Sequence, residues 1–82
     1  MVSVSPRRYV VDANFVAGIS DYLAGRPPPK IYSNFLYEDG RLFAAALRRR
    51  GLKPEAMSAA QRATWMVRLH ADGTIISGQR RS

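Results

Sequence analysis

The chain of 82 residues has no cysteine, one histidine and only six acidic residues. Without cysteine, neither a disulfide framework nor a thiolate metal site is possible, so packing must hold the fold and the cytoplasm is the expected location. No apolar run approaches the roughly 20 residues of a membrane span. The N-terminal sequence also lacks the charged and apolar order of a secretory signal, so we expect no membrane association and no export.

The same scarcity predicts that the protein is not an enzyme. His70 has no acidic residue or serine placed to make it a base, and near a helix end a histidine is ordinary. "VVDAN", residues 10–14, resembles the first strand of PIN-domain nucleases, but their metal sites need several clustered carboxylates. Asp12 is explained better as a helix cap. With no glycine-rich phosphate loop either, we expect no catalytic, cofactor or metal site.

What the sequence does contain is enough apolar material for one compact domain. Hydrophobic residues make up 46% of the chain and aromatic ones 10%, which is too apolar for a disordered protein. At this size folding hides only about 60% of the unfolded surface, so the core must be thin. We expect a single domain over residues 1–82, with flexible ends at 1–6 and 78–82.

Positive charge is concentrated in one half of the sequence. The net charge is +7, and residues 1–40 contribute none of it because four basic and four acidic side chains cancel. Residues 41–82 carry nine basic and two acidic side chains. This asymmetry suggests a surface that meets a polyanion or an acidic protein, although a genome rich in arginine codons would also produce it.

The pattern of the first forty residues predicts a strand and a helix. "RRYVVDA", residues 7–13, is a short β-branched and aromatic run typical of a strand. Asp12 or Asn14 can then cap a helix that ends at Gly25. Its apolar stripe consists of Phe15, Ile19, Tyr22 and Leu23. The proline run that follows is a stiff connector.

Two further helices are expected in the basic half. The second begins near Ser33, or after Asp39 if the aromatic segment is irregular, and ends at Gly51, with a disturbance expected at Gly40. Its inward residues should be Leu42, Phe43, Ala46 and Leu47. Ser58 and Gln61 have the spacing of a capping box, so a third helix should run over residues 59–71. "TIIS", residues 74–77, is typical of a short strand.

A third helix leading into a strand resembles part of a known family. "RLHADGTI", with Arg68, Leu69, Gly73 and Ile75, resembles the end of the recognition helix and the first wing strand of winged helix-turn-helix DNA-binding regulators. The resemblance covers residues 41–77. It implies an α+β fold in which three helices lie on a minimal two-stranded sheet, the N-terminal strand pairing with the wing-like one.

If the resemblance holds, the protein is a transcriptional regulator that binds DNA. A helical wheel places Gln61, Thr64 and Arg68 together, opposite the apolar side of the third helix, where they could read bases in a major groove. The side chains expected to contact phosphates are Arg48, Arg49, Arg50, Lys53, Arg62, Arg80 and Arg81. Arg62 lies at the edge of the apolar side and could instead cover packed aromatics. A homodimer, or help from a larger partner, is expected because so small a monomer binds weakly.

A second hypothesis uses the same charge for a different partner. Small proteins of phages and mobile elements often act as adaptors or inhibitors that bind an acidic surface of a host protein. Such a protein would present aromatic side chains at the centre of its contact, and the candidates are Tyr32, Phe35, Tyr37 and Trp65. RNA binding is a further alternative.

Overall fold

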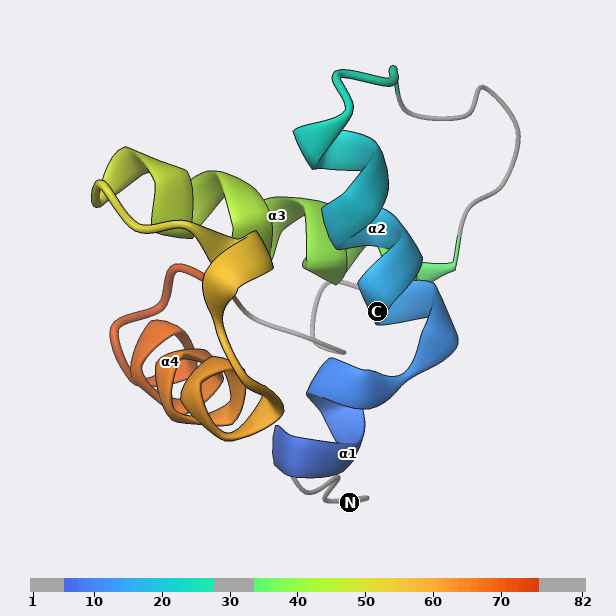
Figure 1. Cartoon of the computed structure of the whole chain (residues 1–82). Coiled ribbons are helices and arrows are strands. Elements are labelled where there is room, and N and C mark those ends of the chain that lie inside the picture. The colour runs from blue at the N-terminus through green and yellow to red at the C-terminus, as the bar shows by residue number, and fades with distance from the viewer. Residues whose placement is uncertain (1–5, 28–33, 76–82) are drawn as a thin grey trace.

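A computed structural model describes residues 6–27 and 34–75, and this part of the chain contains helices and no strand. In chain order the elements are α1 (Pro6–Val11), α2 (Ala13–Leu23), α3 (Phe35–Arg49), the short 3-10 helix η1 (Pro54–Ala56) and α4 (Ala59–Ala71) (Figure 1). The expected α+β fold with a two-stranded sheet is therefore wrong. The molecule is a four-helix assembly over the residues that the structure describes.

The predicted N-terminal strand is a helix because of where its apolar residues must point. Tyr9 and Val10 are neighbours and both are buried, whereas a strand would send them to opposite faces. Val11, which would share the face of Tyr9 in a strand, is exposed. Pro6 stands at the first helical position, where its missing amide proton is no loss. Burial of two adjacent side chains thus overrides the β-branched composition.

The predicted wing strand is also absent from the described residues, because Thr74 and Ile75 close α4 instead. Both backbone amides donate to the carbonyl oxygen of Leu69, at 2.9 and 3.2 Å, and Gly73 donates to that of His70 at 3.2 Å. Gly73 has φ +79°, which this helix ending requires. Ile75 then turns into the core and is 1% exposed. Ile76 and Ser77 lie outside the described residues.

Helices α2 and α3 cross at two glycines. A methyl group on Gly18 would lie 2.1 Å from the carbonyl oxygen of Tyr37, and one on Gly40 would lie 2.1 Å from that of Phe15. Gly40 therefore allows the two backbones to touch, and α3 continues through it without the expected disturbance. Asp12 caps α2 as predicted, accepting from the amide of Asn14 at 2.8 Å.

The second predicted helix is confirmed with shifted details. It begins after Asn34, whose side chain accepts from the amide of Leu36 at 2.7 Å, and neither Ser33 nor Asp39 is its cap. Phe43, Ala46 and Leu47 are fully buried as predicted. Leu42 is not: it is 43% exposed, so the prediction that it faces the core is wrong.

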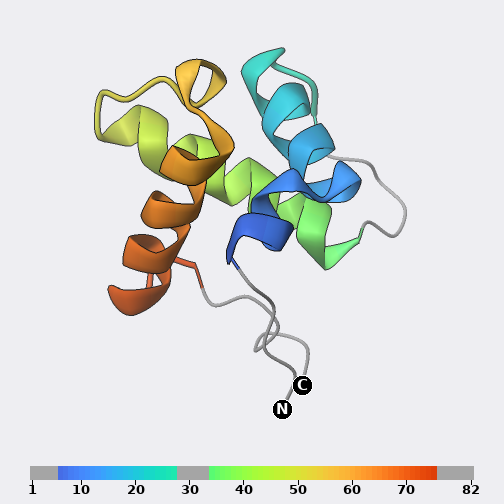
Figure 2. The same cartoon turned by 60° about the horizontal axis from the view of Figure 1, so that its bottom comes forward.

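Helix α4 follows the prediction closely, and α1 packs against it (Figure 2). The capping box forms with both of its hydrogen bonds, 2.9 Å from the amide of Ser58 to Gln61 Oε1 and 3.1 Å from the amide of Gln61 to Ser58 Oγ. The apolar side expected from Ala59, Ala63, Met66 and Leu69 faces the core, where the last three are buried and Ala59 is half-buried.

Tyr9 connects α1 to the three other α-helices. Its hydroxyl donates to Asp39 Oδ2 of α3 at 2.6 Å, and Asp39 is completely buried. Its ring meets the edge of Phe15 of α2 at 5.5 Å and of His70 of α4 at 6.3 Å between centroids. The core is thus closed around one aromatic side chain.

Candidate functional site

The outer face of α4 is the part of the molecule where polar side chains project together from a rigid helix. Gln61, Thr64 and Arg68 are all exposed, while the opposite side of the same helix lies in the core. In Figure 2 α4 lies at the left of the molecule, below the C-terminal end of α3, with α1 and α2 on its right. The expected grouping and exposure of these three residues are therefore confirmed.

Two of the three side chains already use part of their hydrogen-bonding capacity within α4. Gln61 Oε1 accepts the amide of Ser58 in the capping box, so one lone pair of this oxygen and the two N–H donors of the side-chain amide are left for a ligand. Thr64 Oγ1 donates to the carbonyl oxygen of Ala60 at 3.1 Å. Toward solvent Thr64 therefore offers acceptor lone pairs and its methyl group.

Arg68 is held by an aromatic ring. Its Cζ lies 5.1 Å from the ring centroid of Trp65, within cation–π range. Trp65 is itself half-buried and packs against the core. Among the described residues no carboxylate pairs with Arg68, so its guanidinium is positioned without losing its N–H donors.

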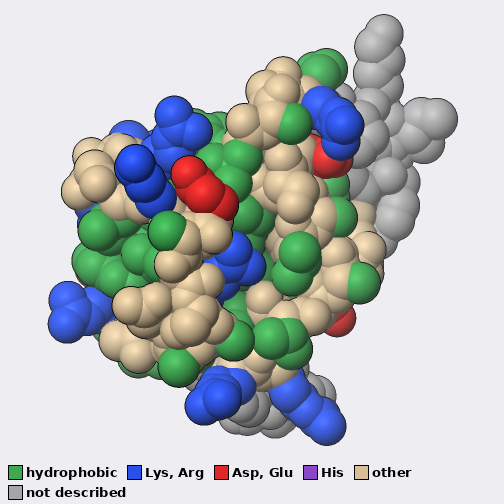
Figure 3. Space-filling model, viewed as in Figure 1, with side chains coloured by type: hydrophobic (Ala, Val, Ile, Leu, Met, Phe, Trp, Pro, Cys, Tyr) green, Lys and Arg blue, Asp and Glu red, His purple; other side chains and the backbone are tan. Residues whose placement is uncertain are grey.

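The end of α3 and the turn before α4 carry cations with no counter-charge. Arg48, Arg49 and Lys53 are exposed, and the side chain of each makes no hydrogen bond or ion pair with a described residue. On the face shown in Figure 3, Lys and Arg side chains gather at this end of α3, with one acidic side chain beside them. This group lies on the same side of the molecule as α4 (Figure 1).

Two other arginines of the predicted phosphate set have structural partners. Arg62 donates from Nε and Nη2 to the carbonyl oxygen of Pro54, at 3.2 and 2.8 Å, and so ties α4 to η1. Arg50 donates to the carbonyl of Ala46 at 3.2 Å and to Asp72 at 3.3 Å. Arg62 has no paired carboxylate among the described residues, so its charge still adds to the local field. Arg80 and Arg81 lie outside the described residues.

Asp72 is drawn into the ending of α4. The side-chain hydroxyl and backbone amide of Thr74 donate to Asp72 Oδ1 at 2.6 and 2.9 Å. These hydrogen bonds, followed by the nearby charge of Arg50, hold the pKa of Asp72 below its ordinary value. The carboxylate therefore offsets Arg50 and does not pair with Arg48 or Arg49.

The described aromatic residues of the protein-binding hypothesis are not fully exposed on the surface. Phe35, Tyr37 and Trp65 are all half-buried, and Tyr32 lies outside the described residues. Tyr37 donates its hydroxyl to Asp21 Oδ2 at 2.7 Å. This bond, then the salt bridge from Arg26 at 3.0 Å, lowers the pKa of Asp21. These contacts join α2 to α3.

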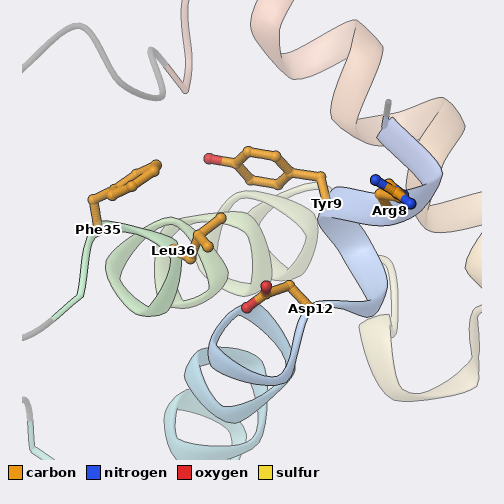
Figure 4. Close-up of a pocket in the computed structure, with 5 residues that line it drawn as sticks. All are labelled: Arg8, Tyr9, Asp12, Phe35 and Leu36. Carbon is orange, nitrogen blue, oxygen red and sulfur yellow. The ribbon is translucent and has the colours of Figure 1, made fainter. Parts of the chain in front are cut away.

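A shallow pocket of about 410 Å³ lies between α1 and the start of α3. Figure 4 shows the rings of Tyr9 and Phe35 pointing toward each other across it, above Leu36. Arg8 and Asp12 complete its lining, and Asp12 Oδ1 is occupied by its capping bond. The pocket has no set of converging polar groups that defines a ligand.

The sequence interpretation missed the role of Trp65, which it grouped with possible contact aromatics. The signal was available, since residues three apart on a helix are neighbours and Trp65 precedes Arg68 by that spacing. The Tyr9–Asp39 pair, thirty residues apart, leaves no such local signal.

Comparisons with known proteins do not assign this site. Searches of protein-family models, curated proteins and solved structures found no match to the chain. Among the described residues no group of three or more potential metal ligands is present. None of the described helices combines the length and apolar character needed to cross a bilayer.

Proposed function

We propose that the protein is a small DNA-binding regulator that places the outer face of α4 in a major groove. The observation that carries this proposal is the exposure of Gln61, Thr64 and Arg68 on one face of a helix whose other face is locked in the core. A helix held in this way can enter a groove without reorganising. The proposal relies on α4 alone, since the described part of the chain contains no strand.

The cations near this face supply the general attraction. Arg48, Arg49 and Lys53 have no partner among the described residues, so they can contact phosphates without breaking an existing contact. Neutralising phosphates releases counterions and fixes the register of the protein on the duplex. A homodimer on a two-fold site would double a contact that is small for one copy.

The test is a mobility shift with random-sequence duplex DNA over a series of salt concentrations. We expect binding that weakens steeply with salt, and Arg49→Ala should lower the slope of log K against log salt by about 0.9. Arg26→Ala is the control. It removes the same charge from the turn after α2, a helix whose main packing partner is α3 and not α4, so the slope should stay unchanged.

Absence of a shift at low salt would refute DNA binding. A pull-down that then retained an acidic protein through the same arginines would favour the adaptor or inhibitor hypothesis. If Arg49→Ala and Arg26→Ala changed the salt slope equally, DNA would be attracted by the net charge of the protein alone, and the proposed binding face would be refuted.

A further inference from the structure

We propose that the outer face of α4 selects guanine, and in particular G·C pairs, over adenine. This inference rests on the DNA binding proposed above and specifies what the face reads. It follows from which hydrogen-bonding atoms of Gln61, Thr64 and Arg68 remain free in the folded protein.

Arg68 supplies the main contact. Its Cζ lies over the ring of Trp65, 5.1 Å from the centroid, and this contact uses none of the N–H donors of the guanidinium. Guanine presents two acceptors in the major groove, O6 and N7, which an arginine fork matches with two bonds. Trp65 is a positioning residue for this contact, since it holds the fork in one orientation before DNA arrives.

Gln61 is oriented by the capping box. Its Oε1 accepts the amide of Ser58 at 2.9 Å, which leaves one lone pair on that oxygen and both N–H donors of the amide. A glutamine recognises adenine by accepting from N6 and donating to N7 at the same time, so an adenine contact would have to share Oε1 with Ser58. The NH₂ group can donate to the acceptors of guanine without sharing. We therefore expect guanine to be the better partner of this side chain.

Thr64 fits the opposite base of the same pair. Its hydroxyl proton points to the carbonyl of Ala60, which leaves an acceptor toward the groove. Cytosine presents an N4 amino donor there, so a G·C pair satisfies Thr64 as well. The three side chains together offer donors to guanine and an acceptor to cytosine.

The experiment measures binding of the full chain to duplexes selected from a random pool, and then to matched duplexes with A·T in place of the selected G·C pairs. We expect guanine enrichment and at least about tenfold tighter binding to the G·C duplex. Replacing the selected guanines by 7-deazaguanine, which lacks the N7 acceptor, should remove most of this preference while leaving the salt dependence unchanged.

Four variants assign the preference to the side chains. Arg68→Lys keeps the charge but loses the fork, so the salt slope should persist while the preference falls about tenfold. Gln61→Glu keeps an acceptor for the Ser58 amide but removes the NH₂ donors, so it should also lower the preference. Trp65→Leu should weaken the guanine preference, and Trp65→Phe should retain part of it. Thermal melts of the two Trp65 variants check that each of them folds.

Equal affinity for the two duplexes, or a preference for A·T, would overturn the guanine inference and leave DNA binding standing. A guanine preference that survives Arg68→Lys would also overturn it. No binding to any duplex at low salt would remove the proposed function and this inference together.

Discussion

At the scale of single residues, the least replaceable contact is the hydrogen bond between Tyr9 and Asp39. The carboxyl group of Asp39 is completely buried, and the other buried side chains of α3, such as Phe43 and Leu47, are apolar. Burying a polar group is costly when its partner is removed, whereas the bond itself adds little net stability. The importance of this hydrogen bond therefore shows as a loss of stability when one of its two partners is removed.

Tyr9→Phe keeps the ring that packs on Phe15 and His70 but removes the donor to Asp39. We expect the free energy of unfolding to fall by about 1–3 kcal/mol, measured by urea denaturation. Tyr37→Phe, which removes a partly buried hydroxyl from Asp21, is the control and should cost less. Equal losses in the two variants would contradict the special role given to burial.

The pKa of Asp21 makes a separate prediction about pH. The hydroxyl of Tyr37, and then Arg26, lower it from the ordinary 3.8. A carboxylate whose pKa is depressed by folding stabilises the protein above its unfolded pKa, and this contribution is lost as the pH falls through the folded pKa. The stability gap between wild type and Asp21→Asn should therefore be greatest well above pH 3.8 and should narrow as the pH falls below that value. A gap that does not change with pH would contradict this.

At the scale of helices, local signals in the sequence predicted where helices begin and end better than they predicted whether a segment is a helix or a strand. The cap at Asp12, the capping box of Ser58 and Gln61, and the glycine ending of α4 are all present. Each is decided by residues only a few positions apart, so the sequence displays it directly. The outer face of α4 was predictable for the same reason.

Contacts between distant segments decided the rest, and the sequence does not display them. The run at residues 7–13 has strand composition, yet the adjacent pair Tyr9 and Val10 must both reach the core. Thr74 and Ile75 look like a strand but fold back on Leu69. Partners for Arg50 and Arg62 also come from other elements, which is why the phosphate set divided into free and engaged arginines.

The crossing of α2 and α3 gives the prediction at this scale. Gly18→Ala would place a methyl group 2.1 Å from a backbone carbonyl, and a helix backbone cannot turn aside as a flexible side chain can. We expect a loss of about 3 kcal/mol or more in unfolding free energy, although alanine is the better helix former. Ser20→Ala, at an exposed position of the same helix, should change stability little. A neutral Gly18→Ala would mean that the helices can separate freely.

At the scale of the whole molecule, the proposed binding face and the core-packing face lie on opposite sides of α4. The inner residues of α4 join the core, and Arg68 together with Arg48, Arg49 and Lys53 remains open to solvent. Substitutions of these four residues should therefore change the proposed DNA binding while leaving the melting temperature nearly unchanged. Gln61 is the exception, because its side chain also closes the capping box of α4.

The packing of α1 on α4 has a consequence for how the protein is made. Of the described helices, α1 leaves the ribosome before the others, whereas α4, which packs against it, leaves after them. Until then Tyr9 can reach Asp39 and Phe15 but not His70, and the apolar side of α1 remains partly open. The growing chain therefore completes its core only when the segment through Ile75 has emerged.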